Sequence, residues 1–149
     1  MSMKNASDEK PEFIIIQKFN ELVKRYSQDS GTAHFSEPEK IVWSVVCVRC
    51  EMDINGFASV FEQLISRDEL TEFIGYLKQI GLDELSAYFQ QIANILEEHS
   101  FYNESGHARK MCFELPPEVV EIIDQIEDKV IEENELWGVD PTLCRLLNE

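Results

Sequence analysis

The chain has 149 residues with 29 acidic and 13 basic side chains, which give a net charge of −16 at pH 7. Its hydrophobic content of 44% is enough to fill the core of one domain. The charge argues against nucleic acid and anionic membranes as direct partners, because like charges repel. The sequence has no apolar run near the ~20 residues that span a bilayer and no signal-peptide pattern, which predicts a cytoplasmic protein.

The negative charge increases toward the C-terminus. Residues 1–50 carry seven acids and seven bases, residues 51–113 carry eleven and four, and residues 114–149 carry eleven and two, so these segments contribute 0, −7 and −9. A basic protein surface is the natural electrostatic complement of such a chain. Solubility alone also explains a high negative charge, and both interpretations stay open at this point.

The first third of the chain predicts two helices after a flexible leader. Residues 1–11 are polar and lack periodicity, whereas apolar residues recur every three to four positions over Glu12–Gln28. Ser36 and Glu39 then form the pattern of a capping box with a proline between them. This start signal favours a buried helix over Ile41–Met52, although the valine-rich segment would also suit a strand.

Helical periodicity continues through the rest of the chain. Apolar stripes predict three helices over residues 57–65, 70–80 and 85–96, with Gly81 as the C-cap of the second and Asp83 as the N-cap of the third. A loop is expected over residues 99–115. A long helix then runs from Pro116-Pro117 to about Leu136, where Gly138 terminates it, and a short helix begins at Asp140. We therefore predict an all-α protein of about six to seven helices, organised as a single compact domain over residues 12–149.

A sharp turn is predicted directly after the second helix. Asn55 and Gly56 are the residue types that most readily accept a positive φ, so the chain can reverse there before Phe57. The turn is flanked by carboxylates such as Glu51 but has no nearby base, nucleophile or ligand. It predicts a structural corner between two helices and not an active site.

Residues typical of catalytic or metal sites do not form a recognisable group. Cys47 and Cys50 have redox or zinc spacing, but they lie in the apolar helix without a second matching pair, so buried and reduced cysteines are favoured. The three histidines fall in predicted loops without a ligand spacing, and no phosphate-binding or nucleophile motif is present. The sequence predicts no catalytic residue, no metal site, no cofactor and no enzymatic activity.

The corner run Glu51-Met52-Asp53-Ile54-Asn55-Gly56-Phe57 resembles the motif of a bacterial family of small acidic proteins of unknown function, which includes a DNA mimic. The residues that match this motif are Glu51, Gly56, Phe57, Phe61, Ile80 and Gly81, with Asn55 at its first glycine. The residues that depart from it are Ile54, Ser59, Val60 and Gln63. The resemblance implies a helical fold, a homodimer, no catalysis and, in one branch, binding to a DNA-binding transcription factor in place of DNA.

The long C-terminal helix predicts an acidic outer face. On a helical wheel its buried face consists of Val119, Ile122, Ile123, Ile126, Val130 and Trp137. The acidic row opposite consists of Glu121, Asp124, Asp128, Glu132 and Glu135. The mean step of this row is roughly 5.3 Å, against about 3.4 Å per phosphate along one DNA strand. A DNA-like surface therefore needs a second acidic row, for which the candidates are Glu69 and Glu72, Glu97 and Glu98, or a dimer mate.

We interpret the chain as an acidic interaction module that binds a basic protein surface, as a DNA mimic on a DNA-binding protein. The predicted binding surface is the acidic row, and the predicted structural corner consists of Glu51, Asn55, Gly56, Phe57 and Phe61. Two alternatives stay open. One is an immunity or antitoxin protein that neutralises a basic toxin, and the other is a hydrolase whose site has no recognisable motif.

Overall fold

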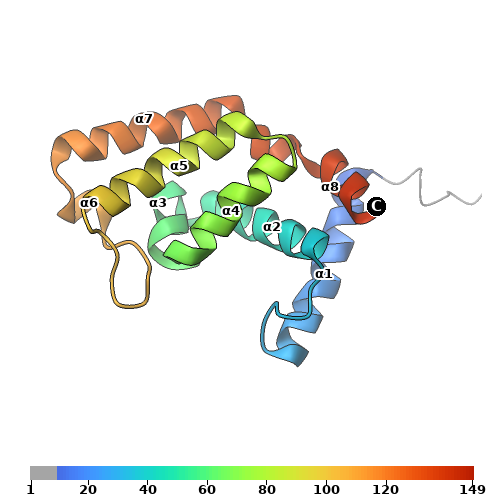
Figure 1. Cartoon of the computed structure of the whole chain (residues 1–149). Helices are drawn as coiled ribbons and strands as arrows, with labels where there is room; N and C mark the ends of the chain where they lie inside the picture. The colour runs from blue at the N-terminus through green and yellow to red at the C-terminus, as the bar shows by residue number, and fades with distance from the viewer. Residues whose placement is uncertain (1–9) are drawn as a thin grey trace, which may run out of the picture. The chain divides into compact units, whose positions relative to one another are not determined.

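A computed structural model describes residues 10–149, and all regular secondary structure in this range is helical (Figure 1). The α-helices are α1 (Pro11–Asp29), α2 (Glu37–Asn55), α3 (Phe57–Ser59), α4 (Arg67–Gln79), α5 (Asp83–Glu98), α6 (Met111–Glu114), α7 (Pro117–Glu133) and α8 (Asp140–Leu147). A π-helix, η2 (Val60–Leu64), follows α3, and a 3₁₀-helix, η3 (Glu135–Gly138), follows α7. The leader expected over residues 1–11 lies mostly outside the described residues.

The all-α class is confirmed, and the eight α-helices slightly exceed the predicted six to seven. The additional helix is α6, which has four residues, whereas α3 and η2 together occupy the stripe expected over residues 57–65. Helix α6 is too short to reveal an apolar period in the sequence. The segment that contains α6 was expected as a loop, and before this helix it forms one isolated antiparallel bridge between Tyr102 and Ala108.

The chain divides into two compact units. The terminal unit comprises the described residues up to Val46 together with Trp137–Glu149, and the central unit is Cys47–Leu136. Helix α2 contributes its first half to the terminal unit and its second half to the central unit. The single domain expected over residues 12–149 stays a prediction.

An aromatic cluster forms the centre of the terminal unit. The Trp43 ring stacks on Tyr26 with a centroid distance of 4.9 Å and also contacts Phe19 at 5.1 Å and Phe35 at 5.6 Å. These rings join α1, the following loop and α2. Helix α1 also contacts α8, where the thiol of Cys144 donates to the Pro11 carbonyl.

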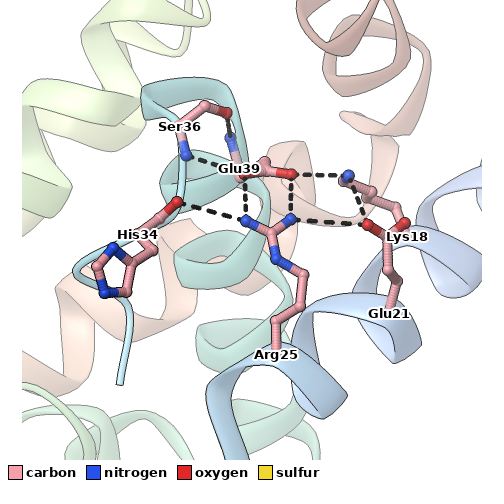
Figure 2. A network of polar contacts seen from close by, with 6 residues as sticks. All are labelled: Lys18, Glu21, Arg25, His34, Ser36 and Glu39. Carbon is pink, nitrogen blue, oxygen red and sulfur yellow. Dashed lines mark hydrogen bonds and ion pairs between the residues drawn. The ribbon is translucent and has the colours of Figure 1, made fainter. Parts of the chain in front are cut away.

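A network of charged side chains joins α1 to the start of α2 (Figure 2). The carboxylate of Glu39 accepts hydrogen bonds from Arg25 at 2.6 and 3.1 Å and lies 2.8 Å from the Lys18 ammonium. Glu39 also completes the predicted capping box, because it accepts from the Ser36 amide and its own amide donates to the Ser36 hydroxyl. The hydrogen bond from Arg25 holds the pKa of Glu39 well below its usual range.

Four buried phenylalanines form the core of the central unit. The Phe89 ring on α5 contacts Phe57 at 5.8 Å, Phe61 at 5.5 Å and Phe73 at 5.2 Å between centroids. Helices α4 and α5 pack together, and the buried Ser86 hydroxyl donates to the Ile74 carbonyl at 3.0 Å. The segment between α2 and α4 is thus anchored by aromatic contacts to α5.

The corner after α2 depends on one residue with positive φ. Gly56 has a φ of +93°, whereas Asn55 is the last helical residue of α2 and has no positive φ, contrary to the expectation for it. The Asn55 amide donates back to the Glu51 carboxylate at 3.1 Å, and the Ser59 hydroxyl donates to the same carboxylate at 3.0 Å. The hydrogen bond to Glu51 holds Asn55 in the helical conformation. Gly56 is therefore the one residue of this turn that needs a positive φ.

Several predicted boundaries differ from the structure. Helix α7 ends at Glu133 and not near Leu136, because Asn134 adopts the left-handed conformation with φ of +55° and caps the helix. Asp83 is the first residue of α5, and its expected N-cap position is taken by Leu82. Among the residues expected on the buried face of α7, Ile122 is 47% exposed, and Trp137 lies beyond the helix in η3.

We predict that Gly56→Val lowers the free energy of unfolding by more than about 1 kcal/mol, because a β-branched residue is strained at positive φ. A Cβ at this position meets no atom within 4 Å, so the loss measures backbone strain and not a clash. Urea denaturation monitored by circular dichroism provides the measurement. The control is Gly75→Ala in α4, where the space is equally open and φ is not positive, and it should stabilise the protein slightly.

We also predict that Glu39→Gln costs about 1–2 kcal/mol of stability at pH 7. The pKa of Glu39 is lower in the folded than in the unfolded chain, so its contribution is present above the ordinary pKa and is lost as the pH falls. The difference between wild type and variant should therefore shrink below about pH 4. Denaturation curves at several pH values measure this, with the exposed Glu98→Gln as the control, and a difference that persists at low pH would contradict the argument.

Candidate protein-interaction surface

The two units carry very different charges. The central unit contains twenty acids and six bases, a net charge of −14, and the rest of the chain contains nine acids and seven bases, a net charge of −2. The two values add to the total of −16. Almost all of the net negative charge of this protein therefore belongs to the central unit.

Helix α7 presents four carboxylates on the face opposite its buried residues. Its buried side chains are Ile123, Ile126 and Val130, and its exposed acidic side chains are Glu121, Asp124, Asp128 and Glu132. Glu135 does not extend this row, because it lies beyond the helix end in η3 and is half-buried. We keep the name acidic row for the four exposed carboxylates of α7.

The acidic row is not neutralised by neighbouring cations. Within the described part of the chain, none of its four carboxylates makes an ion pair or a side-chain hydrogen bond. The segment from Pro117 to Glu135 contains eight acids and only one base, Lys129. The pKa of the half-buried Glu127 is raised, first by its burial and then by repulsion from Asp124 and Asp128.

A second group of carboxylates lies at the C-terminal end of α7. Helices α5 and α7 lie side by side in Figure 1, and the Tyr88 hydroxyl on α5 donates to the Glu133 carboxylate at 2.9 Å. This bond raises the pKa of Tyr88 to about 12. Carboxylate oxygens of Glu84, Glu133 and Glu135 lie within 4.8 Å of one another. We call these three residues the acidic cluster.

The acidic cluster is the only group of possible metal ligands found in residues 10–149. Two of its members are exposed and the third is half-buried, so the carboxylates are accessible to solvent. Partial burial and then repulsion from Glu133, Glu84 and Asp83 raise the pKa of Glu135. The cluster concentrates negative charge at the position where the acidic row ends.

Three of the four acids named for a second row have local partners, whereas Glu98 is exposed and makes no ion pair or side-chain hydrogen bond in the described chain. Glu69 forms a capping box with Ser66 at the start of α4, and Glu97 forms an ion pair with Arg67. Glu72 accepts a long hydrogen bond from Tyr76 at 3.5 Å. The sequence reasoning missed Glu84, although α5 has four acids and no base, a signal that points to an acidic neighbour for α7.

The residues of the corner motif lie in the core or hold the turn. Phe57 and Phe61 are buried, and Glu51 accepts bonds from Asn55 and Ser59. Two of the departures from the family motif, Ile54 and Gln63, are exposed, whereas Val60 is buried. This arrangement stabilises the local turn and leaves no side chain placed for chemistry.

The cysteines are free thiols without a metal-binding arrangement. Cys47 is half-buried and burial raises its pKa to about 12, so it stays protonated at neutral pH. Cys50 is exposed, contrary to the expectation that both cysteines of this pair are buried.

One serine and one histidine approach each other in the loop before α6. The Ser105 hydroxyl lies 3.0 Å from Nδ1 of His107, but it also lies 2.6 Å from the Asn103 side-chain oxygen, which can only accept. The hydroxyl therefore donates to Asn103, and the histidine ring donates to the hydroxyl. In this arrangement the histidine does not remove the serine proton, so the pair serves the turn and not nucleophilic catalysis.

The family comparison agrees with the motif resemblance over a longer segment. The family model described as DMP19-like protein matches residues 33–146, which is most of the chain. No curated protein and no solved structure matches the chain. No helix within residues 10–149 is long and apolar enough to cross a membrane. The chain belongs to the DMP19-like family, a family of DNA-mimic proteins that is not a known enzyme family.

We predict that Glu135→Gln raises the melting temperature at pH 7, because it removes one charge from three that repel. The pKa of Glu135 is raised in the folded chain, so the gain should be present where the group is ionised and disappear below about pH 4. Added salt should reduce the gain by screening. The control Glu121→Gln removes an exposed acid outside the acidic cluster, and an equal gain in both variants would contradict a local effect.

Proposed function

We propose that this DMP19-like protein is a non-catalytic interaction protein that binds a DNA-binding protein in place of DNA. The observation that carries the proposal is the acidic row of α7, which is exposed and makes no ion pair or side-chain hydrogen bond in the described chain. Family membership adds the kind of partner, a basic surface that otherwise binds DNA. We also propose that the protein acts in the bacterial cytoplasm, where DNA-binding proteins of this kind are found.

The spacing of the acidic row limits how it imitates DNA. From Glu121 to Glu132 the helix rises by eleven residue steps, which corresponds to a mean spacing of about 5.5 Å between successive carboxylates, against about 3.4 Å per phosphate of one strand. The row alone therefore has roughly 60% of the linear charge density of one strand. The acidic cluster at the end of α7 supplies the additional charge, with Glu84 from the neighbouring helix α5.

The partner must supply lysine or arginine side chains along a ridge about 16 Å long, which is the length of the row on α7. Association through such a surface is fast and falls steeply with salt. A basic toxin would fit the same surface, as expected for an immunity protein. Competition with DNA separates the two kinds of partner, because only the DNA-binding protein loses its DNA when this chain binds.

We predict that replacing Asp124, Asp128 and Glu132 together by lysine abolishes binding to the partner. The three side chains are exposed and make no ion pair or hydrogen bond in the described chain, so the fold should survive. The partner is first isolated on the immobilised wild-type chain and identified by mass spectrometry. Affinity is then measured by fluorescence anisotropy at low and high salt, with a labelled DNA duplex as competitor.

The matched control replaces Asp29, Glu104 and Glu149 by lysine, which changes the net charge by the same six units at exposed residues that do not belong to α7. This control should lose affinity only slightly, whereas the α7 variant should lose at least about a hundredfold, or about 2.7 kcal/mol. Equal losses in the two variants would show that only net charge matters. A complex that contains the partner, DNA and this chain together would end the mimic proposal.

A further inference from the structure

An exposed isoleucine interrupts the acidic surface of α7. Ile131 is 54% exposed, although its neighbours on the helix include three carboxylates. Asp128 lies three positions before it and Glu127 lies four positions before it, and residues at these spacings are neighbours on a helix surface. Glu132 follows Ile131 directly and belongs to the acidic row. The exposed part of this apolar side chain is therefore bordered by negative charge along α7.

A second exposed isoleucine of α7 lies farther from the acidic row. Ile122 is 47% exposed, and no member of the row lies three or four positions from it. On a helical wheel, Ile131 lies about 65° to one side of the centre of the row, whereas Ile122 lies about 115° to the other side. One helix thus carries two isoleucines of similar exposure, of which only Ile131 is next to the row.

An apolar side chain within a charged border has the composition of an interface centre. Protein interfaces combine an apolar core, from which water is excluded, with a polar rim. A partner that covers the exposed part of Ile131 removes it from water, and the charge pairs around it strengthen because the local dielectric constant falls. DNA offers proteins a similar combination, since thymine methyl groups lie at the base edges between the two phosphate backbones. A protein surface that contacts both therefore carries apolar as well as basic side chains.

We propose that Ile131 is the apolar contact of the partner-binding surface, where it packs against an apolar side chain of the basic surface that binds the acidic row. This inference rests on the proposed function, because it takes the acidic row as the binding surface. The neighbouring carboxylates select the occupant, since they attract a basic surface and repel an acidic one. The acidic row supplies attraction over a distance, and Ile131 supplies a contact that requires a close fit.

Truncation of this side chain in the full chain tests the proposal. The two probes are the partner isolated on the immobilised wild-type chain, and poly-L-lysine, whose side chains all end in ammonium groups. Ile131→Ala should weaken binding of the isolated partner about fivefold to tenfold, because the exposed half of an isoleucine loses its contact. The affinity for poly-L-lysine should stay unchanged. In fluorescence anisotropy at several salt concentrations, the loss with the partner should be the same at each, because no charge is removed.

Two control variants make the result specific. Ile122→Ala truncates the same kind of side chain on the same helix and should change the affinity for neither probe. Asp128→Asn removes one charge of the acidic row beside Ile131, so it should weaken binding of both probes, and its effect should shrink as salt rises. Circular dichroism should show wild-type helix content for each variant, since alanine favours a helix more than isoleucine does.

The outcomes separate this inference from the proposed function. If the triple lysine variant of the acidic row keeps its affinity for the partner, the proposed function is wrong. If that variant loses binding whereas Ile131→Ala keeps wild-type affinity, only the apolar contact is wrong. Equal losses in Ile122→Ala and Ile131→Ala also overturn the apolar contact, and so does an equal loss of Ile131→Ala with the partner and with poly-L-lysine.

Discussion

Burial of the aromatic core is the interaction on which the acidic surface of the central unit depends. Twenty carboxylates and six basic side chains surround this core, so repulsion opposes the compact state at neutral pH. Phe89 contacts three other buried phenylalanines, including the two from the corner segment. Because α5 carries Phe89 and α7 packs on α5, the same contacts hold the acidic row and the acidic cluster on a rigid base.

The sequence predicts those helices best that have both a clear apolar period and a start signal. The capping box at Ser36 and Glu39 correctly decided the valine-rich segment in favour of a helix. The predicted helix ends were wrong where two residues near the end of a helix could each terminate it. Asn134 ends α7 before Gly138 is reached, because asparagine tolerates the left-handed conformation when its amide can bond back to the helix. The local sequence pattern alone does not show which of two such residues ends the helix.

The candidate surface was predictable only in the part that lies on one helix. The wheel of α7 identifies Glu121, Asp124, Asp128 and Glu132, because helix geometry fixes which face each residue occupies. The acidic cluster requires two helices to be neighbours, which the sequence does not state. Glu135 was assigned to the row because α7 was expected to continue, and the turn at Asn134 moves it toward Glu84 instead.

Charge is distributed unequally between the two units of the chain. The central unit carries −14 and the rest of the chain carries −2. A contact between a basic protein and the central unit would weaken as salt rises, because its gain would be electrostatic. The buried residues Ile123, Ile126 and Val130 occupy the opposite face of α7 and so keep the acidic row facing solvent. The exposure of the negative charge therefore depends on the same apolar packing that stabilises the central unit.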